Sequence, residues 1–133
     1  MKLRPYEETD IPLLQQWIKL PQIQSAVNVS KYEPDKPYMF YFITKDNEEP
    51  IGAITLFNIE WNEQAEIGIA FVKNVFNKSL VKELINFVSL AFQVYRLKRV
   101  YAHHNGSKAE KFAEYFGFKN GVLLREDFLG RWF

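Results

Sequence analysis

Residues 65–83 constrain the fold more than any other part of the chain, because an apolar run there leads directly into a helical pattern. Residues 67–72 are uninterruptedly apolar or small, which predicts a buried strand. A short polar turn follows, and a long helical pattern begins near Ser79. Where a strand runs into the first turn of a helix, unpaired backbone N–H groups and the positive end of the helix dipole favour a bound phosphate or pyrophosphate.

The composition is that of an ordinary globular domain. Of 133 residues, 47% are hydrophobic and 25% are charged, which suits one domain over residues 1–133. The 17 basic and 16 acidic side chains give a net charge of +1, so there is no electrostatic reason to expect nucleic-acid or membrane binding. Cysteine is absent, which excludes disulfides and thiolate nucleophiles. The opening segment lacks the apolar region of a secretion signal, and no apolar run is long enough to span a membrane, so we expect a soluble, cytoplasmic domain.

The first part of the chain is predicted to contain a strand, two helices and a loop. The strand covers residues 2–4 and is closed by Pro5. A helix should begin at Thr9 or Asp10, with Pro12 in its first turn, and end near Leu20 because Pro21 disfavours helix for its predecessor. A short helix over residues 22–28 and a loop over residues 29–37 follow.

The rest of the chain predicts a meander of strands followed by alternating helices and strands. Three strands separated by short turns favour an antiparallel arrangement, at residues 38–45, 51–61 and 65–72. After them we expect a heavily buried helix at 79–95, a strand at 99–103, a helix at 107–116 and a strand at 121–127 that pairs with 128–133. Strands and helices without strict alternation indicate a mixed α+β domain.

Three stretches of the sequence resemble one known family. They are LRPYEETDIPLLQQW, AEIGIAFV, and a C-terminal pattern of Asn105, Ser107, Glu114, Gly117-Phe118, Gly121 and Leu124-Arg125. In this order they resemble the GNAT family of acyl-CoA N-acyltransferases, particularly the branch that modifies the N-termini of ribosomal proteins. The resemblance implies a single GNAT-like α/β domain with a central mixed, mostly antiparallel sheet flanked by helices. It also implies transfer of an acetyl group from acetyl-CoA to a primary amine by direct attack in a ternary complex.

The resemblance places coenzyme A at the turn between the strand and the helix. The family's loop there reads Gln/Arg-x-x-Gly-x-Gly/Ala, and Phe76, Ser79 and Val81 replace its three defining residues. A hydroxyl at Ser79 can cap the helix and donate to phosphate, and Lys78 can supply a cation. The strand N–H that polarises the thioester carbonyl falls at Phe71 or Val72, and Asn105 matches the residue that holds the pantetheine arm. The full set of implied coenzyme ligands is Phe71, Val72, Asn77, Lys78, Ser79, Leu80, Asn105 and Ser107.

In this family the amine attacks the thioester directly, so the protein positions the two substrates and removes a proton. Glu66 is the candidate general base, and strand alternation places it on the same face as Gly68. It could equally be a solvated strand carboxylate paired with a cross-strand cation. His103 and His104 are further candidates because they titrate near neutral pH, although an inward histidine is often only a core residue. Ala113 occupies the position of the family's frequent tyrosine acid, so the acid is unassigned.

Several alternatives stay open at this point. The altered loop also fits a GNAT-like domain that has lost the coenzyme and acts as a binding or scaffold protein. An aromatic set could line an acceptor pocket, serve a small-ligand or peptide binder, or belong to the core: Tyr38, Phe40, Phe42, Phe57 and Trp61. We expect no metal, since two adjacent histidines lack a third ligand. The acceptor, a small-molecule or peptide amine, is not specified, and a homodimer through an exposed strand or residues 128–133 is open.

Overall fold

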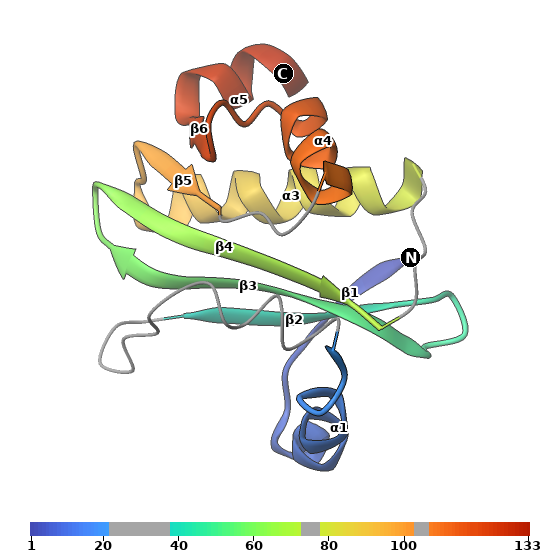
Figure 1. Ribbon diagram of the computed structural model, residues 1–133. Helices are drawn as coiled ribbons and strands as arrows, with labels where there is room; N and C mark the ends of the chain where they lie inside the picture. The colour runs from blue at the N-terminus through green and yellow to red at the C-terminus, as the bar shows by residue number, and fades with distance from the viewer. Residues whose placement is uncertain (22–37, 73–77, 103–106) are drawn as a thin grey trace.

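One sheet runs through all four segments that the computed structural model describes, residues 1–21, 38–72, 78–102 and 107–133. Its described strands are neighbours in sequence order (Figure 1). They are β1 (Lys2–Pro5), β2 (Met39–Thr44), β3 (Pro50–Glu60), β4 (Gln64–Phe71), β5 (Arg99–Tyr101) and β6 (Val122–Leu124). Only β4 and β5 are parallel among these neighbouring pairs. The prediction of a mixed, mostly antiparallel sheet is confirmed.

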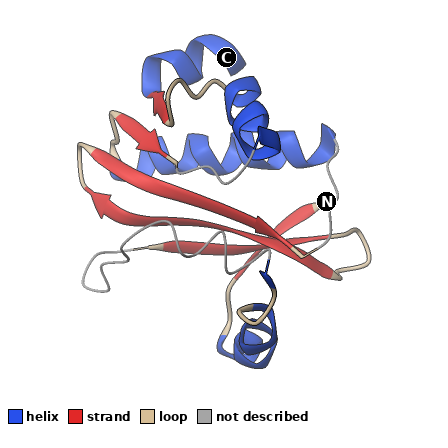
Figure 2. Ribbon diagram, viewed as in Figure 1, coloured by secondary structure: helices blue, strands red, loops and turns tan. Residues whose placement is uncertain are grey.

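Helices lie on both faces of this sheet (Figure 2). A single 3-10 turn, η1 (Glu8–Asp10), and helix α1 (Ile11–Trp17) lie on one face. The other side carries α3 (Lys78–Tyr95), α4 (Ser107–Phe116) and α5 (Arg125–Trp132). The bounds of α4 are those predicted, whereas α1 ends at Trp17, before the predicted Leu20. After Trp17 the backbone hydrogen bonds join residues three apart, since the Leu20 N–H donates to the Trp17 carbonyl at 2.9 Å.

The apolar core forms two clusters, one on each face of the sheet. The larger lies under α3, which buries Leu80, Leu84, Val88, Ala91 and Phe92 as its helical period predicts, and Phe87 in addition. In the smaller cluster the Trp17 ring of α1 meets Phe42 edge-on, with centroids 5.5 Å apart. Because strand side chains alternate, Ile69 of β4 packs in the first cluster and Ala70 in the second.

A charged pair ties β1 to the turn before α1. The Arg4 guanidinium donates to both Asp10 carboxylate oxygens, at 3.0 and 2.9 Å, and the Glu7 N–H donates to the same carboxylate at 2.8 Å. The Arg4 hydrogen bonds hold the pKa of Asp10 below its ordinary value. A depressed folded-state pKa means that this contribution to stability is present above the unfolded pKa of about 3.9. It is lost as pH falls through the folded value.

The C-terminal segment departs from its prediction. Strand β6 ends at Leu124, and the residues expected to extend it and pair as a strand form α5 instead. The Arg125 N–H donates to the Lys98 carbonyl at 3.0 Å, beside the last register pair of β5 and β6. From there Phe128 and Trp132, spaced four apart, face the same cluster: Phe128 is fully buried, and the Trp132 Nε1–H donates to the Phe116 carbonyl at 2.9 Å. Residues 128–133 therefore offer no strand edge to a second copy.

Candidate functional site

The parallel strands β4 and β5 are paired over only part of β4. Their register runs from Gln64↔Arg99 to Glu66↔Tyr101, where β5 ends, while β4 continues to Phe71 with β3 as its partner. Figure 1 shows β5 stopping well short of the end of β4. Beyond Glu66, one edge of β4 is therefore open among the described residues, and this open edge is the centre of the candidate site.

The backbone of β4 shows which amides face the open edge. The Val72 N–H donates to the Ile51 carbonyl of β3 at 2.9 Å, so it points away from the open edge. Gly52 of β3 lies so close that a Cβ there would stand 2.5 Å from the Ala70 carbonyl oxygen, which also faces β3. Since amides alternate along a strand, the N–H of Phe71 faces the open edge. Of the two predicted carbonyl-polarising donors, Phe71 has the right direction, and the Val72 amide is already engaged with β3.

Glu66 lies at the start of the open edge, on the α1 face of the sheet. Its side chain is 4% exposed, so the prediction of a solvated carboxylate is wrong. Its direct cross-strand neighbours are Phe57 and Tyr101, neither of them a cation, although Glu66 is not without an interaction partner. Gly68 shares its face, because a Cβ there would meet the Phe57 ring at 3.4 Å. A buried carboxylate beside an aromatic ring, next to open backbone, is a candidate proton acceptor.

The first turn of α3 begins at Lys78, seven residues after the end of β4. Ser79 is exposed, and its Oγ accepts a hydrogen bond from the α-amino group of Met1 at 2.9 Å. Leu80 is fully buried in the core, so only its backbone could face a ligand. Val81, which replaces a small residue of the family loop, is also buried, at 8% exposure. Its side chain therefore does not obstruct the position in front of the helix.

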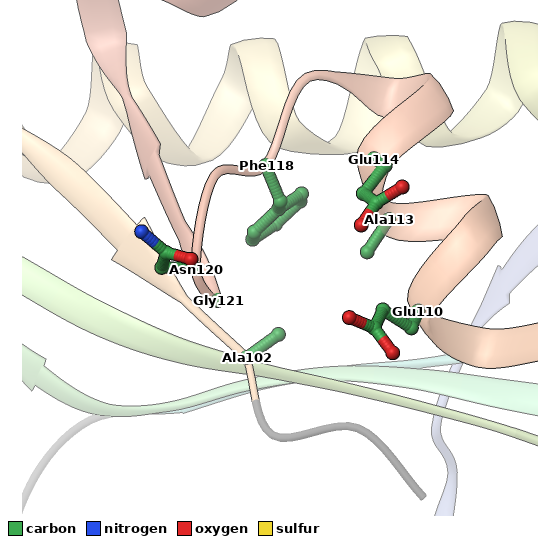
Figure 3. Close-up of a pocket in the computed structure, with 7 residues that line it drawn as sticks. All are labelled: Ala102, Glu110, Ala113, Glu114, Phe118, Asn120 and Gly121. Carbon is green, nitrogen blue, oxygen red and sulfur yellow. The ribbon is translucent and has the colours of Figure 1, made fainter. Parts of the chain in front are cut away.

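A hollow of about 270 Å³ lies between the end of β5 and α4 (Figure 3). Its lining is Ala102, Glu110, Ala113, Glu114, Phe118, Asn120 and Gly121. The α4 members recur at the helical period and so share one face, while Asn120 and Gly121 take left-handed backbone conformations in the turn opposite. No pattern in the sequence predicts this hollow, although Asn-Gly after a helix is a recognised turn signal.

The hollow includes the position where the family resemblance expects a tyrosine. Ala113 is buried there, and its short side chain leaves space beside Phe118. Tyr115, the nearby alternative, is 51% exposed and turns the other way. Its ring meets Trp132 at 5.9 Å between centroids and lies 5.3 Å from the Arg131 guanidinium carbon. Tyr115 therefore does not substitute for the missing acid.

Several predicted site residues lie outside the described residues. They are Asn77, His103, His104 and Asn105, together with Phe76 of the altered loop. The backbones of Lys78 and Ser107 are described as the first residues of α3 and α4, but their side chains are not. The roles predicted for these residues stay predictions.

The aromatic set predicted from the sequence does not form one pocket. Phe40 and Phe42 pack in the α1 cluster, whereas Trp61, at 55% exposure, meets Tyr95 of α3 edge-on at 4.8 Å. Within the described residues, no three His, Cys, Asp or Glu side chains are grouped so as to hold a metal ion. No described helix is both long and apolar enough to cross a membrane.

Comparison with known families and structures gives a consistent result. The family model described as an acetyltransferase (GNAT) domain matches residues 1–119. No curated protein has a sequence that matches the chain significantly. The solved structure of spermidine N-acetyltransferase from Vibrio cholerae in complex with CoA and spermine has a TM-score of 0.75 at 20% identity, covering 96% of this chain and 97% of that one.

Two further structures have the same fold. The F149A mutant of the Vibrio cholerae spermidine N-acetyltransferase has a TM-score of 0.73 at 17% identity, over 98% of this chain and 99% of its own. A probable acetyltransferase has a TM-score of 0.71 at 19% identity, over 94% of this chain and 93% of its own. The TM-scores and coverages establish a fold shared with these structures along almost the full length of both chains.

Proposed function

The chain belongs to the GNAT acetyltransferase family, whose acyl donor is acetyl-CoA, and from this premise we propose that it acetylates a primary amine by direct attack in a ternary complex. The observation that carries the proposal is the open edge of β4 with buried Glu66 at its start. A family scaffold with a closed sheet at this point would have no backbone donor to offer a thioester.

We assign the acetyl group to the open edge. The Phe71 N–H faces that edge and would donate to the thioester carbonyl, where negative charge develops as the amine attacks. The pyrophosphate would lie at the first turn of α3, with Ser79 and the backbone of Leu80 as donors. Lys78, Asn77, Asn105 and Ser107 complete the proposed coenzyme site by resemblance.

Glu66 acts in this proposal as the general base, directly or through water. It takes a proton from the substrate ammonium to free the nucleophilic amine, or from the amine nitrogen as it attacks; the nitrogen bonds to the carbonyl carbon, and the carbon–sulfur bond breaks. Coenzyme A leaves as a thiolate and takes a proton from solvent, because Ala113 supplies none. His103 or His104 is the alternative base. The burial of Glu66 beside Phe57 supports Glu66 as the first residue to test.

The acceptor is an aliphatic primary amine. The similar structures named for spermidine acetylation make polyamines the first class to test. The sequence resemblance to the ribosomal-protein branch makes a peptide N-terminus the second.

The proposal is tested by incubating the protein with acetyl-CoA and an amine panel of spermidine, spermine, a lysine-containing peptide blocked at its N-terminus and a peptide with a free N-terminus. We expect acetylated product and free coenzyme A in equal amounts with at least one acceptor, at a turnover on the order of 1 s⁻¹ or faster. Heat-unfolded protein is the control. Binding of acetyl-CoA without product across the panel would contradict acetyl transfer and favour a binding or scaffold role.

A further inference from the structure

A second, larger hollow lies at the opposite end of β4 from the open edge. Its volume is about 600 Å³, and it is lined by the turn before β4, the segment between α3 and β5, and the start of α5. Strand β4 runs from Gln64 to Phe71, a length of about 23 Å at roughly 3.3 Å per residue. This distance separates the hollow from the proposed position of the thioester at the open edge. The hollow is therefore not part of the proposed acetyl-transfer site.

Four cationic side chains line this hollow. We name it the basic groove, defined by Arg96, Lys98, Arg99, Arg125, Leu124 and Leu129. Lys98 and Arg99 are both paired with Glu63, at 3.2 and 3.8 Å, and Arg99 also donates to the Gln64 side chain at 3.1 Å. Arg96 and Arg125 are exposed and have no acidic partner among the described residues. One acidic side chain, Glu126, also lines the groove, so cations predominate there in a chain whose net charge is only +1.

The backbone conformation of Arg96 is a second observation that points to a function for the groove. Arg96 directly follows α3 and has a φ of 53°, in the left-handed region. That position after a helix is ordinarily glycine, because other residues are strained there. An arginine therefore occupies a place where glycine would favour the fold. A residue held in a strained conformation suggests a function for its side chain.

The groove is also partly apolar. Leu124 and Leu129 are exposed by 36% and 42%, and both belong to the same lining as the free arginines. A small anion such as phosphate would contact the guanidinium groups and leave these leucines exposed to water. An extended acidic segment with apolar side chains among its carboxylates would contact both the guanidinium groups and the leucines. Its carboxylates would bind the arginines, since arginine binds a carboxylate through two parallel hydrogen bonds.

We propose that the basic groove binds a carboxylate-rich peptide segment of a partner protein, with apolar side chains of that segment packing on Leu124 and Leu129. Charge complementarity favours an acidic partner, because Arg96 and Arg125, which have no acidic partner among the described residues, line a partly apolar groove. This interaction is separate from acetyl transfer and does not depend on it.

The test uses fluorescence anisotropy with a labelled 12-residue peptide of alternating Glu and Leu, and with a matched peptide of alternating Lys and Leu. The acidic peptide should bind saturably, more weakly as salt rises, and the basic peptide should not bind. Arg96→Gly and Arg125→Gln should each weaken the affinity for the acidic peptide at least tenfold. Arg131→Gln, which removes a charge from the same helix outside the groove, should have no such effect.

Arg96→Gly separates a binding role from a structural one. Glycine relieves the left-handed backbone, so this variant should melt at the same temperature as the native chain or higher, and its acetyl-CoA stabilisation should be unchanged. Three results would overturn the proposal: no saturable binding of the acidic peptide, equal binding by Arg96→Gly and the native chain, or equal binding of a Glu and Ser peptide that lacks leucine. The last would indicate attraction to any polyanion.

Discussion

Glu66→Gln should lower kcat by roughly 10²–10⁴-fold, the usual contribution of a general base, while acetyl-CoA binds as before. Gln keeps the size of the side chain but cannot accept a proton from the attacking amine. Glu66 lies on the α1 face at the start of the open edge, whereas the proposed pyrophosphate donors belong to α3. Steady-state rates at saturating acetyl-CoA, with a separate titration of coenzyme binding, measure the two effects independently.

A matched control for Glu66→Gln is Asp10→Asn. Asp10 is also a buried carboxylate among the described residues, but it pairs with Arg4 and lies outside the candidate site. Asp10→Asn should lower the melting temperature and leave kcat nearly unchanged. If Glu66→Gln behaves in the same way, losing stability but keeping its turnover, Glu66 is a structural residue and the base must be sought at His103 or His104.

Phe128→Ala should lower the free energy of unfolding by about 3–5 kcal/mol, which is a large part of the stability of a small domain. Phe128 is fully buried in α5, with its ring centroid 5.4 Å from Phe92 and 5.9 Å from Phe116. Removing it leaves a cavity where α3, α4 and α5 meet. Urea unfolding followed by circular dichroism measures the loss.

Phe133→Ala is the control for this second prediction. Phe133 touches Phe128 at 5.8 Å between centroids but is 75% exposed, so its removal should change the unfolding free energy by less than about 1 kcal/mol. Similar losses for the two variants would contradict the packing of α5, in which Phe128 is fully buried and Phe133 is largely exposed.

The parts of the fold with a strong local period could be predicted from the sequence. Alternation and short turns give the meander of β2, β3 and β4, and the spacing of Leu80, Leu84 and Val88 gives α3. The signals that end α4 are also local: Gly117 has a φ of 121°, and the Phe118 N–H donates to the Ala113 carbonyl at 2.9 Å.

The C-terminal helix could not be predicted in the same way, because two patterns overlap there. Residues 121–127 are predicted as a strand, and the helical spacing of Phe128 and Trp132 covers only two turns. Which pattern holds at each residue depends on distant partners: Val100 and Arg99 of β5 pair with β6, while Phe92 and Phe116 receive Phe128. The segment around Gly130 is short and has low helix propensity, so these tertiary contacts determine its secondary structure.

In the candidate site, sequence alternation gave the face of Glu66 but not its burial. Burial depends on Phe57 and Tyr101, which come from neighbouring strands. The direction of the Val72 amide likewise depends on Ile51, and the hollow beside Ala113 depends on how far α4 lies from the turn at Asn120. The burial of Glu66, the direction of the Val72 amide and the hollow beside Ala113 all depend on residues distant in sequence, so no local pattern predicts them.

The proposal that the altered loop before α3 still binds acetyl-CoA is tested by thermal unfolding with and without millimolar acetyl-CoA. A ligand at about 100 times its dissociation constant stabilises the folded state by roughly 2.7 kcal/mol, which for a chain of this size raises Tm on the order of 10 °C. Sodium phosphate at the same ionic strength is the control and should leave Tm nearly unchanged. A clear rise with acetyl-CoA alone is the predicted result. An unchanged Tm would contradict the claim and identify the domain as a GNAT fold that works without coenzyme, as a binding or scaffold protein.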